Sequence, residues 1–354
     1  MRHDVQSVPH TVTIAVKQQN LEEMERILYA VSDPASPTYG EHLTYEAVHE
    51  LTANPRGTEA TLAWLLSHGI TSTESSDFGE YIEATASVAQ WNELLGADLQ
   101  TMRHVHSDGT VIRSKEFTMP AELEAHVSHI LSVVELPLRQ APAPQVQRAD
   151  EPAIAAYLEK SEARAARVDG GAPYPCHSVM TPLCWNYRYN QTSNDASGES
   201  QLVFGQKPYM ISPSDLTTFA ASYGTPPQTW SVPNGGGGGD SGCQGYDPNM
   251  KGKGYLCVEG DLDVQFMSVT GQAANNTFYQ VQNLNTPFLE FITYASQMPT
   301  PPGVMSISYG SYEYEMDHAL MDQFATEAMK LGVSVLLSTV TCYANRAHNL
   351  TRSP

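Results

Sequence analysis

Two carboxylates placed four residues apart are the residues of this chain with the clearest chemical use. Glu259 and Asp263 stand in the segment Val258-Glu-Gly-Asp-Leu-Asp-Val-Gln-Phe266, and that spacing brings two side chains to one face of a helix. On a solvated face, the commoner setting for such a pair, the two charges only repel each other. In a buried site or a cleft the same groups can share a proton and serve as general base and acid. The surrounding elements decide which setting applies.

Size and charge limit the classes of protein to consider. A chain of 354 residues is long enough for two domains, each with its own core. The 39 acidic against 19 basic residues give a net charge of −20, which argues against nucleic acid or an anionic membrane as a partner. No apolar run approaches the ~20 residues that span a bilayer. The N-terminal residues lack the apolar core of a secretory signal, so either the protein is cytosolic or its start is incomplete.

The cysteines favour disulfides over a metal site. All five lie in the second half of the chain, at Cys176, Cys184, Cys243, Cys257 and Cys342. Intervals of eight and fourteen residues do not match common zinc spacings. We therefore expect one or two disulfides in a secreted domain, with one thiol left over.

Residues 1–136 read as a compact domain in which strands and helices alternate. Asn20 and Glu23 are spaced as a capping box at the start of a helix. The main strands are expected at Thr11–Val16, Tyr81–Thr85 and Ile130–Leu136, and helices at Val88–Leu95 and Ala121–His129. Two rounds of strand, helix and strand predict an antiparallel α+β sandwich with a ferredoxin-like plan.

Residues 137–180 change in character and read as a linker. Six prolines stand there among alanine, glutamine, arginine and glycine. Such exposed segments are where proteolysis concentrates. Four arginines would be accessible to a processing enzyme: Arg139, Arg148, Arg164 and Arg167.

Strands and helices alternate again beyond the linker. Strands are expected at Gln201–Gly205, Phe278–Val281, Val304–Ser308 and Val333–Leu337, and helices at Ser214–Tyr223, Val258–Thr270, Thr286–Ser296 and Glu315–Leu331. This α/β order predicts a parallel sheet covered on both faces. The helix at 258–270 carries the acidic pair, with Leu262, Phe266 and Val269 expected to bury its other face.

Motifs in this order resemble the sedolisin family, the serine-carboxyl peptidases, which include tripeptidyl-peptidase-like members. The segments Ser32-Asp-Pro-Ala-Ser-Pro-Thr-Tyr-Gly40 and Trp64-Leu-Leu-Ser-His-Gly69 are similar to the family's pro-kumamolisin-type activation domain. Thr181-Pro182 with Tyr187-Arg-Tyr-Asn190 resembles the start of the mature enzyme. The acidic segment resembles the Glu-x-x-x-Asp-Val-Gln-Tyr helix, and Val304-Met-Ser-Ile-Ser-Tyr-Gly310 the strand that follows it.

The resemblance implies a fold and a mechanism. It implies a subtilisin-like, doubly wound parallel sheet, incomplete here, preceded by the ferredoxin-like prodomain. A serine would attack the peptide carbonyl, Glu259 would accept the serine proton, and Asp263 would hydrogen-bond to Glu259 and tune it. An ordinary carboxyl titrates near ~4 and histidine near ~6.5, so a carboxylate base still works in acid where histidine is protonated.

The chain departs from the family after the last expected strand. Thr341 stands where the family has the aspartate that stabilises the oxyanion, and residues 339–354 form a non-family tail. The nucleophile segment and the family's calcium loop would lie beyond this chain. We therefore interpret residues 181–338 as the N-terminal part of a catalytic domain, in a truncated precursor that needs no cofactor and is expected to be inactive in this form.

The expected function is that of a sedolisin zymogen, a serine-type hydrolase acting in proteolysis at acidic pH as an endopeptidase or tripeptidyl-peptidase. Its partners would be a peptide or protein substrate and its own prodomain as intramolecular inhibitor, without nucleic acid or membrane. The family implies an extracellular, lysosomal or vacuolar location. The alternative is a non-catalytic, prodomain-bearing fragment that binds or inhibits a full-length relative. The prodomain histidines, His104, His106, His126 and His129, are natural contributors to release at low pH.

Overall fold

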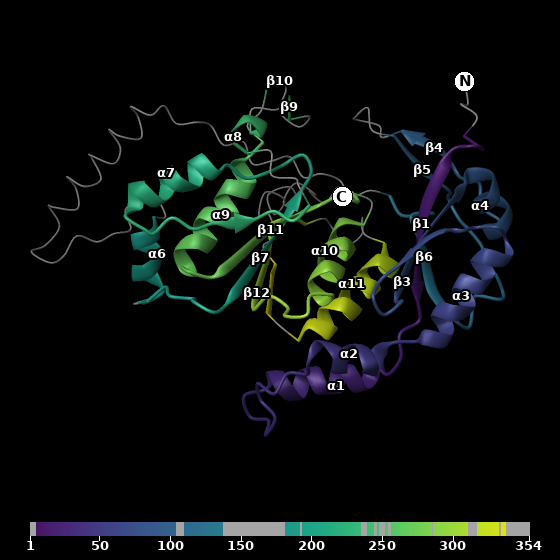
Figure 1. Ribbon diagram of the computed structural model, residues 1–354, viewed down its shortest axis with the longest axis horizontal. Coiled ribbons are helices and arrows are strands. Elements are labelled where there is room, and N and C mark those ends of the chain that lie inside the picture. Colours follow the sequence, from purple (N-terminus) through teal and green to yellow (C-terminus); the bar gives the residue numbers. More distant parts are fainter. Residues whose placement is uncertain are drawn as a thin grey trace, which may run out of the picture. The chain divides into compact units, whose positions relative to one another are not determined.

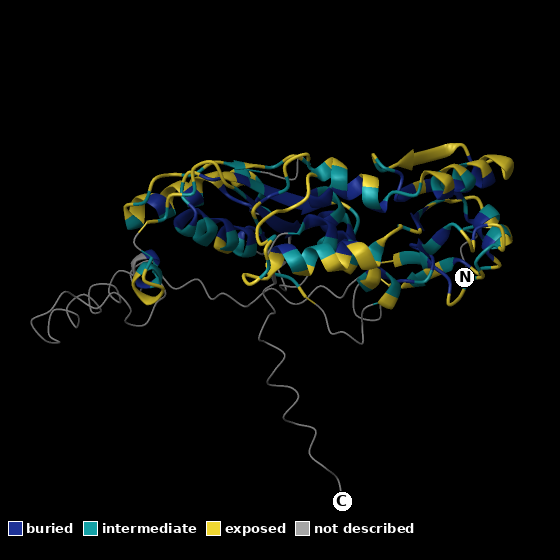
Figure 2. Ribbon diagram, turned by 90° about the horizontal axis from the view of Figure 1, so that it is seen from below, coloured by how far each residue is buried: buried dark blue, intermediate teal, exposed yellow. Residues whose placement is uncertain are grey.

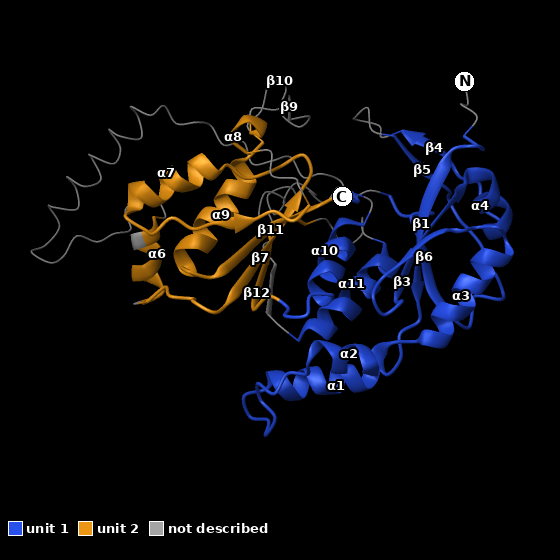
Figure 3. Ribbon diagram, viewed as in Figure 1, with its two compact units in different colours: residues 1–139, 283–301, 311–333 blue, residues 140–282, 302–310, 334–354 orange. Residues whose placement is uncertain are grey.

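The computed structural model divides the chain into two compact units, which are described separately (Figure 3). Unit 1 contains residues 1–139, 283–301 and 311–333, and unit 2 contains residues 140–282, 302–310 and 334–354. The structure describes residues 5–103, 110–136, 181–191, 193–234, 239–243, 246–247, 252–253, 256–284, 286–310, 317–332 and 334–337. The expected linker at 137–180, the tail at 339–354 with Thr341, and His104 and His106 lie outside the described residues.

The core of unit 1 lies against an antiparallel sheet (Figure 1). The sheet has the order β2-β3-β1-β6, and its strands are β1 (Pro9–Val16), β2 (Ser72–Ser75), β3 (Tyr81–Ser87) and β6 (Val127–Leu131). Val12, Ile14 and Val16 alternate along β1 and are buried, as the period of two in a strand requires. They pack in one cluster with Trp91 and Leu95. The sequence therefore predicted this strand and its buried face correctly.

The helices of the N-terminal part of unit 1 are α1 (Leu21–Ser32), α2 (Tyr45–Thr52), α3 (Pro55–Ser67) and α4 (Val88–Leu95), and a hairpin pairs β4 (Gln100–Arg103) with β5 (Thr110–Arg113). A capping box of Ser87 and Gln90 begins α4. The capping box predicted at α1 is wrong, because Asn20 has φ of 53° and its side chain makes no cap hydrogen bond. The helix predicted at Ala121–His129 is also wrong: turns lead into β6, which pairs with β1.

Two helices from late in the chain, α10 (Pro287–Ser296) and α11 (His318–Leu331), belong to unit 1. Asp317 caps the start of α11 by accepting hydrogen bonds from two backbone N–H groups, and Gly332, with φ of 58°, ends it. The predicted start at Glu315 is therefore too early. Phe288 of α10 and Phe324 of α11 meet edge to face, with ring centroids 6.4 Å apart.

A buried charged network in unit 1 joins α2, the residue before β3, and α11. The side chains of His49, Glu80, Glu327 and Lys330 are each at most 2% exposed. Glu80 Oε1 lies 2.7 Å from His49 Nδ1 and 3.1 Å from Lys330 Nζ. Glu327 Oε2 lies 3.0 Å from Lys330 Nζ and accepts a hydrogen bond from the Ser296 hydroxyl at 2.7 Å. Since buried charges are tolerated only when paired, this network fixes how α11 packs.

Unit 2 is built on a parallel sheet. Its strands are β7 (Ser200–Gln206), β8 (Trp230–Ser231), β11 (Asn275–Val281), β12 (Val304–Ile307) and β13 (Ser334–Leu337). Their order is β13-β12-β7-β11-β8, and every pairing is parallel. The predicted parallel α/β sheet is confirmed. Gly205 of β7 admits the ring of Phe278, because a Cβ there would lie 2.3 Å from that ring.

The helices of unit 2 are α6 (Pro182–Arg188), α7 (Pro213–Tyr223), the short α8 (Gly239–Gly242) and α9 (Val258–Thr270), and a small hairpin pairs β9 (Tyr246–Asp247) with β10 (Gly252–Lys253). Val264 of α9 packs with Val203 and Phe278 of the sheet. Figure 2 shows buried strands beside helices that are partly exposed. In the part of the chain that the structure describes, no helix has the length and apolar character to cross a membrane.

Candidate active site

The acidic pair lies on α9, close to residues that follow two neighbouring strands. Ser308 and Tyr309 come directly after β12, and Tyr209 follows β7, the strand paired with β12. The carboxyl ends of parallel strands meet at one edge of a sheet, where open α/β folds bind ligands. The hydrogen bond between Asp263 and Ser308 therefore places the helix with the two carboxylates at the carboxyl end of this sheet.

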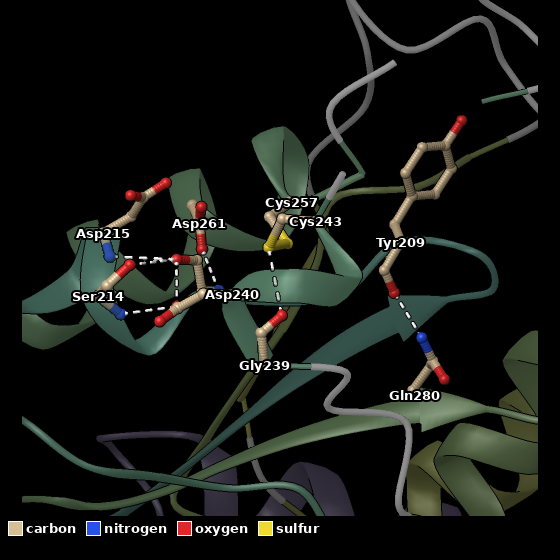
Figure 4. The surroundings of a disulfide bond; sticks show 10 residues. Tyr209, Ser214, Asp215, Gly239, Asp240, Cys243, Cys257, Asp261 and Gln280 are labelled. Carbon is tan, nitrogen blue, oxygen red and sulfur yellow. Dashed lines mark hydrogen bonds between the residues drawn. A yellow bond between two sulfur atoms is a disulfide. The ribbon is translucent and has the colours of Figure 1, made fainter. Parts of the chain in front are cut away.

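A disulfide fixes the residue at which α9 begins. Cys243 and Cys257 are bonded, with Cα atoms 5.2 Å apart, and Cys257 is the N-cap of α9 (Figure 4). Cys184 is also disulfide-bonded. The predicted preference for disulfides is thus confirmed.

Gly260, between the two carboxylates, seats the first turn of α9 against the backbone. A Cβ at this position would lie 2.4 Å from the backbone oxygen of Met210. The predicted burial of Leu262 is wrong, since it is 49% exposed. The face of α9 that carries Gly260 therefore packs against the backbone at Met210, and Leu262 is exposed.

Gly260→Ala is expected to lower the stability of unit 2 by about 1–3 kcal/mol, because an overpacked site can relieve the clash only by moving the backbone. The measurement is urea unfolding followed by circular dichroism. Leu262→Ala, on the exposed face of the same helix, is the matched control and should change stability by less than about 1 kcal/mol. Equal effects of the two substitutions would contradict the tight contact.

The hydrogen bond to Asp263 comes from an unexpected residue. Ser308 Oγ donates to Asp263 Oδ1 at 2.7 Å. Asp263 Oδ2 is buried and has no hydrogen-bond partner among the described residues, so the predicted bond to Glu259 is not formed there. Sequence reasoning placed Ser308 in a family-like strand but gave it no role. Its position at the carboxyl end of a buried strand was the available signal.

Burial is the main cause of the raised pKa values in the site. Burial, together with the charge of Glu259, raises the pKa of Asp263 to about 7, and the hydrogen bond from Ser308 opposes the rise. Burial also raises the pKa of Glu259. The pKa of Tyr309 lies well above its ordinary value because of burial and the charges of both carboxylates. Because the charge of Glu259 acts on Asp263, the two carboxyls titrate as a pair.

A second acidic group was missed from the sequence. Asp261, between the two predicted residues, is buried, and its Oδ1 accepts the backbone N–H of Ser212 at 2.7 Å. Asp240 and Asp215 lie nearby (Figure 4), and burial together with the charges of these two carboxyls raises the pKa of Asp261 to about 7. Two residues along a helix is about half a turn, so α9 carries acid groups on opposite faces.

No three or more His, Cys, Asp or Glu residues among those described are arranged to hold a metal ion.

Comparison with known proteins matches both parts of the chain. Residues 4–136 match the family described as pro-kumamolisin, activation domain. The chain is 27% identical over 334 residues to tripeptidyl-peptidase 1 of Homo sapiens, 27% over 335 residues to that of Rattus norvegicus, and 26% over 333 residues to that of Mus musculus. Each match covers 90% of this chain and 53% of the relative, so the chain spans about half the length of the curated relatives it matches. Residues 4–136 therefore match an activation domain of the pro-kumamolisin type, and the chain as a whole is similar to tripeptidyl-peptidase 1.

Proposed function

We propose that this chain is a serine-type peptidase precursor of the sedolisin family that hydrolyses peptide bonds in acid, as an endopeptidase or a tripeptidyl-peptidase. The observation that carries the proposal is the pair Glu259 and Asp263, set on α9 next to the carboxyl end of β12, with both pKa values raised. A carboxylate whose pKa is raised accepts a proton more readily than an ordinary one, which is what a general base must do.

In this proposal Glu259 is the general base and Asp263 its partner. Glu259 takes the proton of the family's serine as that oxygen attacks the peptide carbonyl, and the proton then passes to the leaving amine. Asp263 stabilises the protonated state of the pair. The five-stranded parallel sheet supports a subtilisin-like catalytic domain, and the four-stranded antiparallel sheet supports a ferredoxin-like prodomain.

The activation domain would act as an intramolecular inhibitor of peptide or protein substrate binding. The disulfide at Cys243 and Cys257 supports an oxidising location, extracellular or in the lysosome or vacuole. This chemistry asks for no cofactor.

Any turnover that the chain shows is expected to fall by at least about 100-fold in Glu259→Gln, because the amide cannot accept the serine proton. The purified chain is incubated near pH 4 with a tripeptide-releasing substrate and with a denatured protein, and products are quantified by mass spectrometry. Glu199→Gln, an exposed carboxylate in unit 2, is the matched control and should keep full turnover. Turnover that survives Glu259→Gln would remove Glu259 from the mechanism.

The match of residues 4–136 to an activation domain favours a second candidate function, inhibition of a full-length relative. If the unaltered chain shows no turnover, titrating it into an active tripeptidyl-peptidase 1 at pH 4–6 tests this alternative. Stoichiometric inhibition would support it.

A further inference from the structure

Ser308 connects the sheet to the acidic pair across 45 residues of sequence. It is the first residue after β12, so the end of a buried parallel strand sets its position. Its hydroxyl donates to Asp263 Oδ1 at 2.7 Å. Because the hydroxyl hydrogen of Ser308 points at Oδ1, this contact orients the carboxyl group of Asp263.

The two oxygens of Asp263 are therefore not equivalent. Oδ1 is held by Ser308, whereas Oδ2 is buried and, within the described residues, has no partner. Glu259 lies one turn earlier on the same face of α9, and its charge acts on Asp263. A buried carboxyl oxygen without a partner is costly, and a proton on Oδ2 would turn it into a donor for Glu259.

We propose that Ser308 is a positioning residue, which holds Asp263 Oδ1 and so assigns to Oδ2 the proton that the pair shares. The inference rests on the proposed function, in which Asp263 is the partner of the base. The proton balance is simple: the pair holds one proton on Asp263 before the reaction, and Glu259 gains a second one from the serine as the nucleophile attacks.

The other titratable groups that face the pair do not replace Ser308. The pKa of Tyr309 is raised well above its ordinary value, so it stays neutral, and its hydroxyl is hydrogen-bonded to the backbone of Gln206. Tyr209, which follows β7, contributes electrostatically to the raised pKa of Tyr309. Asp261 faces the opposite side of α9, toward Ser212. Ser308 is thus the side-chain donor to Asp263 among the described residues.

The test is a pH titration of the Asp263 side-chain carboxyl by ¹³C NMR on the full chain, with Asp263→Asn to assign the signal. This readout needs no peptidase activity, so its failure is separate from a failure of the proposed function. Ser308→Ala should shift the midpoint of Asp263 upward by about one pH unit, because the donor that favours the carboxylate is lost. Glu259→Gln should shift it downward, because a repelling charge is lost.

Two further variants separate positioning from a structural role. Ser308→Thr keeps the hydroxyl and should keep the midpoint of the unaltered chain. Ser306→Ala removes a hydroxyl from β12, two residues before Ser308, and should leave the midpoint of Asp263 unchanged. An unchanged or lowered midpoint in Ser308→Ala would overturn the proposal. If Ser308→Ala does not fold, a shifted midpoint in Ser308→Thr overturns it and an unchanged one supports it.

Discussion

Replacing Lys330 with methionine is expected to lower the free energy of unfolding of unit 1 by about 3–5 kcal/mol, because two buried carboxylates lose their cation. Lys330 Nζ lies 3.1 Å from Glu80 and 3.0 Å from Glu327, and all three side chains are at most 2% exposed. Methionine preserves most of the apolar stem of lysine. The lowered free energy of unfolding therefore comes from the missing charge and not from lost packing. Urea unfolding at pH 7 measures it.

Lys115→Met is the matched control, because Lys115 is exposed in the same unit and its replacement should change stability by less than about 0.5 kcal/mol. Adding Glu80→Gln and Glu327→Gln to Lys330→Met should restore much of the loss, since no unpaired charge remains. A loss of the same size in both lysine variants would show that the buried network contributes nothing specific.

The same network makes unit 1 sensitive to strong acid. Burial alone would raise the pKa of Glu80, but the hydrogen bond with His49 and the charge of Lys330 lower it to about 2. Because the folded pKa lies below the ordinary value of 4.5, the stabilisation is present above pH 4.5 and is lost as the pH falls toward 2. The histidine that takes part is His49, which sequence reasoning did not single out.

Asp261→Asn is expected to stabilise unit 2 at pH 8 by up to about 4 kcal/mol and to have little effect near pH 3. The folded pKa of Asp261 is about 7 against an ordinary 3.8, so the folded chain binds a proton that the unfolded chain releases. Stability in the unaltered protein therefore falls as the pH rises from about 3.8 to about 7, and the uncharged asparagine escapes this fall.

Thermal unfolding at a series of pH values between 3 and 8 measures this effect. Glu199→Gln, which removes an exposed charge in the same unit, should leave the shape of the pH curve unchanged. If the melting temperature of Asp261→Asn equals that of the unaltered protein at every pH, the ionised Asp261 carboxylate does not destabilise the folded state, and the prediction is wrong.

Periodicity predicted the parts of the fold that depend on burial. Alternation identified β1, and the alternating order of strands and helices identified the parallel sheet of unit 2. The failures have local causes. Asn20 has the residue type of a cap but a left-handed backbone, which prevents the cap hydrogen bond. The segment around Val127 has helical spacing, yet pairing with β1 supplies more hydrogen bonds and burial.

Spacing also identified Glu259 and Asp263 as neighbours on α9, because a helix makes residues four apart adjacent. It could not identify their surroundings. Ser308 reaches Asp263 across 45 residues, and Lys330 reaches Glu80 across 250. Contacts at such separations depend on how sheets and helices pack, and one sequence read along its length carries no direct signal of them.

If the chain is a precursor, as proposed, the three-segment make-up of unit 1 has a consequence for its maturation. A cut between residues 137 and 180 would break the chain, but α10 and α11 would remain with the N-terminal fragment through non-covalent contacts alone. For that fragment to leave, Glu80 must part from Lys330, and both charges must be rehydrated. Cleavage and departure are therefore separate events, and we expect a nicked but still assembled form to persist until acid opens the network.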